Sequence, residues 1–500
     1  MEEKLQQLKE RLAEVMDLGY ISAVLGWDQQ TYMPPGGAEE RGYQLATLAR
    51  LVHQHVTSDE VGKLLEDLNR EVDAFDPDSD DACLIRSAYY EYHKRTRVPV
   101  DLVADTAQVT TSAHEAWARA RQEKNFQLFQ PHLERVVELR RAYAECFQPY
   151  DHIYDPLLDD FERGMKTADV QRIFGALRPQ QVALIQAISQ RPQVDDSFLR
   201  VDYPEQGQWD FGVDVISHFG YDWKRGRQDR SAHPFTTNFG IDDVRITTRF
   251  DTQRVATALF GTMHEAGHAM YEQGVDHSLR RTPLAGGASL AVHESQSRMW
   301  ENLVGRSLPF WKYFFPKLKE RFPGQLGNID LETFYRGVNK VEPSFIRVEA
   351  DEATYNLHIM LRLELEIALM EGSLAVKDLP EAWNARAQEY LGLQPPNDAL
   401  GVLQDVHWSG GMIGYFPTYA LGNLVSAQLW ECICRDIPDL DGQIQQGQFN
   451  SLLEWLRKHI HRHGAKFEPQ VLVERVTGSK IDPQPYIRYL QSKFGAIYGL

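Results

Sequence analysis

Residues 263–269 constrain the fold of this chain more than any other segment, and they read Met-His-Glu-Ala-Gly-His-Ala. Apolar residues recur around them with helical spacing, so we predict a helix here. His264 and His268 are then one turn apart on the same helix face, and their imidazoles can bind one metal ion without distorting the backbone. Glu265 projects to the side and can take a proton from a metal-bound water, whose pKa falls to about 7.

The alternative interpretation is a surface or core helix that merely carries two histidines. The flanking residues Leu259, Phe260 and Met270 are apolar, whereas a solvated helix face would carry more charge. Gly267 lowers helix stability relative to alanine, which suggests that another element packs closely at this position. These observations favour a buried helix that binds a metal ion.

A catalytic zinc site usually has three protein ligands and a water molecule, so a third ligand has to come from elsewhere in the chain. The best candidate is Glu294, in a segment that we predict to be helical from about residue 289 to 305. The linker at residues 274–287 contains proline and glycine, so the two helices can pack side by side. The neighbouring His293 could be a ligand, could orient a ligand, or could do neither.

Composition excludes several classes of function. The chain has 500 residues with 43% hydrophobic and 25% charged residues, which is typical of a soluble globular protein. Its formal net charge of −18 argues against a nucleic-acid partner or an anionic membrane, because both need positive patches. The four cysteines lack metal-binding spacing and are expected to be free thiols. Because we find no apolar signal core and no apolar run long enough to span a bilayer, we expect a cytoplasmic protein.

Helical spacing of apolar residues recurs along almost the whole chain, so we predict a mostly α-helical protein. Besides the two helices above, the predicted helices span about 2–25, 38–55, 59–72, 81–97, 100–121, 125–146, 167–190, 206–219, 309–321, 330–341, 345–371, 379–391, 397–407, 418–435, 447–462, 469–476 and 483–497. Residues 233–250 differ, because β-branched and aromatic residues alternate with polar ones and predict strands joined by a turn at 240–242. These strands either hold an extended peptide or form a small structural hairpin.

Six motifs in this order resemble those of the Taq-type thermostable metallocarboxypeptidases, the M32 peptidases. They are His233-Pro234-Phe235, Asp243-x-Arg245-x-Thr247, His264-Glu265-x-x-His268, His293-Glu294-Ser295-Gln296, Ile346-Arg347-x-x-Ala350-Asp351 and Gly401-x-x-Gln404-Asp405-x-His407-Trp408. The resemblance covers essentially the whole chain. It implies a mostly α fold, similar to neurolysin and angiotensin-converting enzyme, with a deep central groove and a small three-stranded β-sheet beside the metal site. It also implies a single catalytic domain over residues 1–500, with two helical lobes around the groove.

The resemblance implies a function as well. Members of this family are typically cytoplasmic homodimers that remove single residues from peptides with a free C-terminus. By this resemblance His264, His268 and Glu294 match the metal ligands, with Zn2+ as the expected ion and Co2+ as an alternative, and Glu265 matches the general base. The expected partners are peptide substrates and a second copy of the chain, without nucleic acid or membrane.

Two motif arginines, Arg245 and Arg347, match the family's binders of the substrate's terminal carboxylate. A guanidinium group stays charged and pairs with a carboxylate through two hydrogen bonds, which agrees with this role. Each arginine could instead form a structural ion pair, Arg245 with Asp243 and Arg347 with Glu349 or Asp351.

The other candidate site residues are polar groups expected near the substrate. His407, Tyr415 and Tyr419 match groups that line the groove in the broader fold, where a hydrogen-bond donor can stabilise the oxyanion of a tetrahedral intermediate. His407 could equally be a buried core histidine. His233 could contact substrate, or it could close a turn before Pro234.

Three other functions remain open from the sequence. An oligopeptidase or dipeptidyl carboxypeptidase could share the same fold. A non-catalytic, zinc-stabilised peptide-binding protein would fill the fourth metal position with a protein ligand, whereas a catalytic site leaves it open. A metal-dependent hydrolase of non-peptide substrates would not cleave peptides.

Overall fold

The computed structural model describes all of residues 1–500, which contain 21 α-helices and a single three-stranded sheet. The predicted mostly α-helical fold with a small three-stranded sheet is therefore confirmed. The chain divides into two compact units. Unit 1 comprises Met1–Thr96, Asp195–Val338 and Leu429–Gly478, and unit 2 comprises Arg97–Val194, Asn339–Gln428 and Ser479–Leu500.

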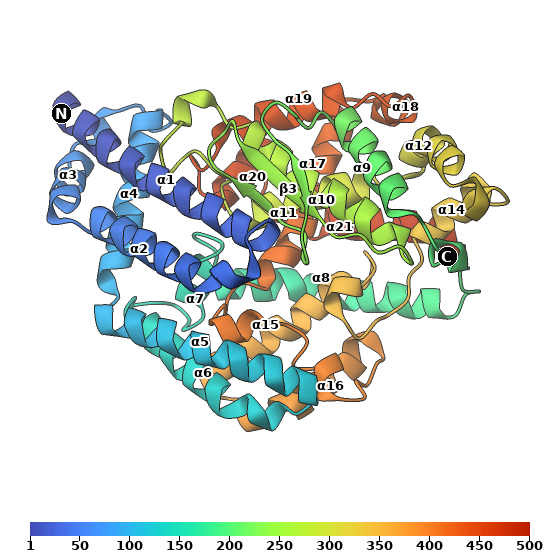
Figure 1. Ribbon diagram of the computed structural model, residues 1–500, viewed down its shortest axis with the longest axis horizontal. Helices are drawn as coiled ribbons and strands as arrows, with labels where there is room; N and C mark the ends of the chain where they lie inside the picture. Colours follow the sequence, from blue (N-terminus) through green and yellow to red (C-terminus); the bar gives the residue numbers. More distant parts are fainter. The chain divides into compact units, whose positions relative to one another are not determined.

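Unit 1 contains the strands and thirteen helices, drawn mainly in blue, green and red in Figure 1. The helices are α1 (Glu2–Thr31), α2 (Ala38–Val56), α3 (Asp59–Asn69), α4 (Asp80–Arg97), α9 (Glu205–Phe219), α10 (Val255–Gln273), α11 (Leu290–Arg298), α12 (Leu308–Arg321), α13 (Pro323–Leu326), α14 (Leu331–Val338), α18 (Leu440–Gln445), α19 (Asn450–His459) and α20 (Pro469–Thr477). A π-helix, Met299–Val304, continues directly from α11.

The regular elements of unit 2 are all helices, and α17 continues from it into unit 1. Its helices are α5 (Val100–Glu123), α6 (Gln130–Glu145), α7 (Asp155–Asp159), α8 (Thr167–Ser189), α15 (Tyr355–Glu371), α16 (Leu379–Leu391), α17 (Pro417–Asp436) and α21 (Gln484–Tyr498).

The sheet consists of β1 (Gln228–Arg230), β2 (Thr236–Asn238) and β3 (Val244–Thr248), in the order β1-β3-β2. β2 pairs with β3 in the antiparallel sense, which confirms the predicted hairpin, whereas β1 pairs with β3 in parallel. The residues alone did not predict β1, because a strand of three residues gives almost no periodic signal.

The register of the hairpin determines which side chains face the helix with the histidines. Thr236 pairs with Ile246 and Asn238 pairs with Val244, so these four side chains share one face of the sheet. Val244 and Ile246 are fully buried there, and both β2 and β3 contact α10. β2 is therefore placed to support α10 directly.

Glycine allows α10 and α11 to approach each other at the level of the backbone. A Cβ atom at Gly267 would lie 2.7 Å from both the carbonyl oxygen of Gln296 and the Cα of Ser297. Only glycine fits at such a distance, and this confirms the close packing predicted from the sequence. The contact holds the helix with the two histidines against the helix with Glu294.

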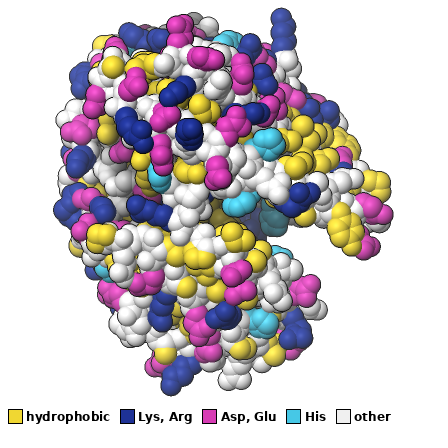
Figure 2. Space-filling view, turned by 90° about the vertical axis from the view of Figure 1, so that its left-hand side faces the viewer, with side chains coloured by type: hydrophobic (Ala, Val, Ile, Leu, Met, Phe, Trp, Pro, Cys, Tyr) yellow, Lys and Arg dark blue, Asp and Glu magenta, His cyan; other side chains and the backbone are white.

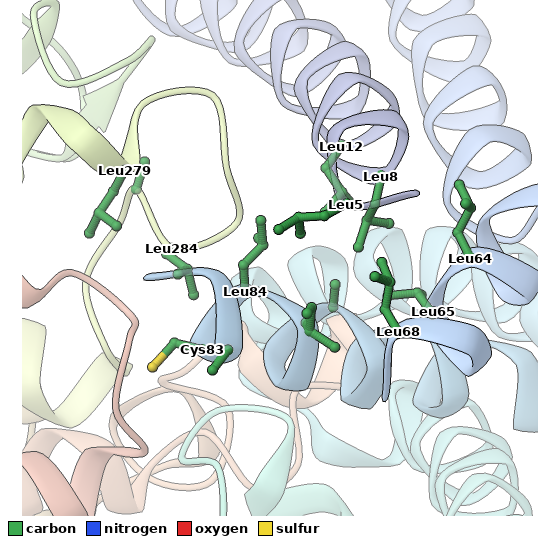
Figure 3. Packing of buried hydrophobic residues seen from close by; sticks show 14 of the residues in the cluster. Leu5, Leu8, Leu12, Leu64, Leu65, Leu68, Cys83, Leu84, Leu279 and Leu284 are labelled. Atoms are coloured by element: carbon green, nitrogen blue, oxygen red, sulfur yellow. The ribbon is translucent and has the colours of Figure 1, made fainter. Parts of the chain in front are cut away.

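A separate leucine-rich cluster joins the N-terminal helices to the linker between α10 and α11 (Figure 3). Its labelled members are Leu5, Leu8 and Leu12 of α1, Leu64, Leu65 and Leu68 of α3, Cys83 and Leu84 of α4, and Leu279 and Leu284 of the linker. Burial of a leucine side chain contributes roughly 1.5–3 kcal/mol, so the cluster anchors the linker as well as the helices.

Three predicted helices differ clearly from the structure. Residues 397–407 form only one short turn, Asp398–Leu400, instead of a helix, and a second turn, His407–Gly410, begins where this range ends. The helix predicted to begin at residue 345 begins only at Tyr355, because the Asp351 carboxylate accepts hydrogen bonds from the backbone nitrogens of Ala353 and Thr354. The first helix extends to Thr31 and is longer than predicted.

None of the helices has the length and apolar character needed to cross a bilayer. Acidic and basic side chains are interspersed over the face drawn in Figure 2, in keeping with a charged chain whose formal net charge is −18. All four cysteines are free thiols, as predicted.

Candidate metal centre

Three side chains of unit 1 converge on one point: His264 and His268 from α10 and Glu294 from α11. The Oε2 atom of Glu294 lies 3.5 Å from Nε2 of His264 and 3.5 Å from Nε2 of His268. The three donor atoms all lie within 4.8 Å of one another. The structure therefore brings together the three residues that the sequence singled out as metal ligands.

Each donor is oriented by a second interaction at its other polar atom. Arg298 donates from Nε to Oε1 of Glu294 at 2.7 Å, so Oε2 faces the histidines. His264 Nδ1 lies 2.9 Å from Oε2 of Glu301, a residue of the π-helix. Glu301 also accepts a hydrogen bond from Arg298 at 3.2 Å. Glu301 was not predicted from the sequence, although it lies seven residues after Glu294 and hence near the same side of the helix.

His268 has a different partner, namely His293. The two Nδ1 atoms are 2.6 Å apart, and Nε2 of His293 lies 2.6 Å from Oε1 of Glu272. Of the three roles considered for His293, the geometry therefore matches a residue that orients a ligand. Glu272 follows His268 by four residues on α10, so the helical spacing could have predicted it.

Glu265 is buried beside the two histidines, and a strand residue holds its carboxylate. Thr236 Oγ1 lies 2.7 Å from Oε2 of Glu265 and 2.9 Å from its backbone oxygen. Burial raises the pKa of Glu265 above its ordinary value. A carboxylate in this state takes up a proton more readily than one in water.

Burial and neighbouring charges act in opposite directions on the converging groups. Burial, with the adjacent imidazoles, lowers the pKa of His268 to about 3, so its ring is neutral at pH 7. Burial also opposes the charge of Glu294, but Arg298 and His264 outweigh it and lower the pKa of the carboxyl group. At neutral pH the cluster thus offers at least one neutral imidazole and an ionised carboxylate, which are metal-binding forms.

These residues fit a divalent metal ion. Two imidazole nitrogens and one carboxylate oxygen are a typical donor set for catalytic zinc, and both histidines present Nε2 while their Nδ1 atoms are engaged elsewhere. The family model described as "Carboxypeptidase Taq (M32) metallopeptidase" matches residues 7–494. The chain belongs to the carboxypeptidase Taq (M32) family.

Named relatives agree with this membership. The chain is 43% identical to "Thermostable carboxypeptidase 1" of Thermus thermophilus and 37% identical to "Carboxypeptidase 1" of Bacillus subtilis, over 99% and 95% of both chains respectively. The crystal structure of an M32 carboxypeptidase from Deinococcus radiodurans superimposes with a TM-score of 0.97 at 42% identity, covering 99% of this chain and 100% of that one. The protein is an M32 metallocarboxypeptidase, and the fold implied by the resemblance is confirmed.

A second polar cluster of this M32 carboxypeptidase lies in unit 2 around Arg347. Nε and Nη2 of Arg347 donate to Oδ1 of Asp405 at 3.0 and 2.9 Å, and Nη1 donates to the hydroxyl of Tyr355 at 2.9 Å. Arg362 donates from Nε to Oδ2 of the same Asp405 at 2.7 Å. Arg347 therefore pairs with Asp405, and not with Glu349 or Asp351. Two guanidinium groups share this one carboxylate, so it cannot balance both charges.

Arg245 forms a one-to-one ion pair in unit 1. Its Nε and Nη2 donate to the two oxygens of Asp243, both at 2.8 Å. Its guanidinium carbon lies 4.5 Å from the ring centre of Trp27 and 4.7 Å from that of Phe239. The ion pair that the sequence offered as the alternative for Arg245 is thus present.

The remaining candidate residues divide between the units. In unit 2, His407 Nε2 lies 3.4 Å from the hydroxyl of Tyr419, and the ring of Tyr415 lies 5.2 Å from that of His407. Burial lowers the pKa of His407 to about 4, so this ring is neutral at pH 7. In unit 1, His233 is exposed, and its backbone oxygen accepts a hydrogen bond from Ser231 Oγ at 2.5 Å.

Proposed function

We propose that His264, His268 and Glu294 hold a catalytic divalent ion, Zn2+ or alternatively Co2+, and that the enzyme releases single residues from peptides with a free C-terminus. The convergence of these three donor atoms within 4.8 Å, with Glu265 beside them, is the observation that supports this proposal most strongly. When bound, such an ion supplies a Lewis acid and lowers the pKa of its water to about 7.

Glu265 acts as the general base in this proposal. Thr236 holds Oε2 of Glu265, which leaves Oε1 to take a proton from the attacking water. Burial of the carboxylate raises its pKa and favours proton uptake. The same carboxyl group then passes the proton to the nitrogen of the leaving residue.

Arg347 is the better candidate for binding the terminal carboxylate of the substrate. Arg347 and Arg362 share Asp405, so their cluster has an excess positive charge that a second carboxylate can balance. Arg245 has less support in this role, because Asp243 already pairs with it through two hydrogen bonds. His233 stays a predicted substrate contact, although its exposure and local turn equally suit a structural role.

We assign stabilisation of the developing oxyanion to His407, Tyr415 and Tyr419. Their rings are in mutual contact, and the hydroxyl of Tyr419 lies within reach of Nε2 of His407. Because His407 is neutral at pH 7, it can fix a tyrosine hydroxyl without adding a charge. In a serine protease, loss of one hydrogen-bond donor to the oxyanion costs roughly 2.7–4 kcal/mol.

The organisation of the protein completes the proposal. We propose a single catalytic domain over residues 1–500 with two helical lobes around a groove, a homodimer, and a location in the cytoplasm. The four free thiols support a reducing compartment. Family membership supports a carboxypeptidase over an oligopeptidase, a scaffold protein or a hydrolase of non-peptide substrates.

A pair of peptides that differ only at the C-terminus tests the proposal. The metal-loaded enzyme should shorten the peptide with a free carboxylate one residue at a time, whereas the amidated peptide should resist, as followed by mass spectrometry. Removal of the metal should abolish release, and added Zn2+ or Co2+ should restore it. Equal cleavage of both peptides would contradict carboxylate recognition, and internal fragments would indicate an oligopeptidase.

A further inference from the structure

We propose that Glu272 and His293 form a hydrogen-bond relay that fixes the ring of His268 in its metal-binding form. The inference rests on the proposed ligand set. It concerns His293, which contacts His268, and Glu272, which contacts His293. His293 and Glu272 are positioning residues in this scheme, because neither presents a donor atom to the converging Nε2 and Oε2 atoms.

The direction of the hydrogens follows from the chemistry of the groups. A carboxylate oxygen accepts, so Nε2 of His293 carries the hydrogen donated to Oε1 of Glu272. In a neutral imidazole the other nitrogen is then an acceptor, so Nδ1 of His293 accepts from Nδ1 of His268. With its hydrogen on Nδ1, His268 has a lone pair on Nε2, the atom that lies beside Glu294. The opposite arrangement would put a hydrogen on that atom and prevent metal binding.

Glu272 is itself fixed at both oxygens. Asn238 of β2 donates from Nδ2 to Oε2 at 2.7 Å, and the backbone nitrogen of Gly287 donates to Oε1 at 3.2 Å. A Cβ atom at residue 287 would lie 2.6 Å from Cδ2 of His293, so glycine also leaves space for the imidazole. The strand, the linker and α10 together hold the relay in place.

The two histidine ligands are therefore oriented in different ways. Nδ1 of His264 contacts the Glu301 carboxylate directly. Nδ1 of His268 contacts His293, which in turn contacts the Glu272 carboxylate. Partners of this kind typically change metal affinity by roughly 10–100-fold. The relay predicts that Glu272 affects metal binding only when His293 is present. Side-chain packing alone does not predict this dependence.

Metal titration of the purified full-length protein tests this inference. The metal-free enzyme is titrated with Zn2+ or Co2+ against a coloured competing chelator, and the visible spectrum of bound Co2+ reports on the ligands. We expect His293→Phe to weaken binding of both ions by roughly 10–100-fold and to alter the Co2+ spectrum. Glu272→Gln, which keeps an acceptor but loses the charge, should weaken binding less. Unchanged affinity in His293→Phe would overturn the relay.

A double-mutant cycle separates the relay from general damage. The affinity of the variant with both His293→Phe and Glu272→Gln should equal that of His293→Phe alone, because Glu272 acts through His293. Additive losses would overturn the relay. His461 is a matched control, since its ring lies 5.1 Å from that of Tyr271, as does the ring of His293. His461→Phe should leave metal affinity unchanged; a loss as large as that of His293→Phe would indicate packing instead.

Failure of the relay and failure of the proposed ligand set give different results. His268→Ala tests the ligand set and should abolish tight binding whatever the role of His293. If His268→Ala retains wild-type affinity, the proposed metal site is wrong. If His268→Ala loses the metal but His293→Phe does not, the site stands and only the relay is wrong. Thermal unfolding of each metal-free variant confirms that it is folded.

Discussion

The hydroxyl of Thr236 lies 2.7 Å from the carboxylate of Glu265 and joins a three-residue strand to the helix that carries the metal-binding motif. A hydroxyl has one hydrogen, which it donates either to this carboxylate or to the Glu265 carbonyl at 2.9 Å. Bonding to the carboxylate fixes the orientation of the proposed general base. The sheet thus places a hydroxyl against the proposed general base, from a residue outside the metal-binding motif.

Replacing Thr236 by valine removes the hydroxyl and keeps the shape of the side chain. Loss of a hydrogen bond to a buried charged group costs roughly 1.5–3 kcal/mol, so we expect kcat to fall by about 10–150-fold with little change in KM. Thr236→Ser should restore most of the rate. The control is Thr237→Val on the opposite face of β2, which should retain wild-type kinetics. A fully active Thr236→Val would show that this hydroxyl does not support Glu265.

Glu265→Gln tests the base itself. The amide cannot take up the proton, so kcat should fall by about 10²–10⁴-fold. Metal content should be unchanged, because Glu265 is not among the converging donors. Steady-state kinetics together with metal analysis of the same sample checks both statements. Wild-type hydrolysis by this variant would exclude Glu265 from proton transfer.

Gly267→Ala should destabilise the protein and weaken metal binding together. The added methyl group meets backbone atoms of Gln296 and Ser297 at 2.7 Å, and overpacking of this kind costs roughly 1–3 kcal/mol. Gly261→Ala is a matched control in the same helix, because its Cβ would meet only Pro234 Cγ at 4.0 Å. The control should be as stable as wild type or gain up to about 1 kcal/mol. Equal thermal stability of both variants would disprove the backbone contact.

Arg347→Lys should selectively reduce recognition of the free C-terminus. Lysine keeps the positive charge beside Asp405 but cannot form the paired contacts of a guanidinium group. We expect kcat/KM for a free peptide to fall by roughly 10–150-fold, the loss expected for charged hydrogen bonds worth about 1.5–3 kcal/mol. Arg245→Lys should have a smaller effect. The reverse order, measured with the same peptide, would transfer the role to Arg245.

His461 should make stability depend on pH on the acid side of neutrality. Burial lowers its pKa to about 3, whereas the unfolded chain binds a proton at this residue near pH 6.5. The stabilisation is therefore complete above pH 6.5 and is lost as the pH falls towards 3. This residue should account for about 2 kcal/mol of the decrease in unfolding free energy between pH 7 and 5.

His461→Gln provides the measurement, since glutamine can still donate to Oε1 of Gln296 but does not titrate. Urea unfolding of the wild type and the variant is compared at pH 7 and pH 5. The variant should lose less stability over this interval. An identical loss in both proteins would show that His461 does not make the pH-dependent contribution proposed for it.

The local part of the metal centre could be predicted because helical geometry alone determines it. His264 and His268 lie on one helix face because they are four residues apart. Gly267 correctly predicted that another element, which is α11, packs closely against this helix. The same rule could have found Glu272, four residues after His268. Glu294 was predictable from its own segment, but its distance from the imidazoles depends on how two helices pack.

The predictions from the sequence were wrong where contacts with distant residues replace the local hydrogen bonds of a helix. Residues 397–407 have helical spacing, yet Asn397 caps a single turn and the side-chain amide of Gln404 donates to the backbone oxygen of Phe345 at 3.0 Å. Asp405 pairs with Arg347 from 58 residues away, and no periodic pattern encodes such a pairing. Tertiary contacts therefore decided both the backbone of this segment and the partner of Arg347.

The backbone contact at Gly267 also has a consequence for the choice of ion. Because α10 and α11 touch directly, the spacing between the histidine pair and Glu294 is set by two rigid helices and not by a flexible loop. An ion of larger radius, such as Cd2+, then has to be accommodated by side-chain rotation alone. We therefore expect selectivity among divalent ions to follow ionic size as well as donor preference.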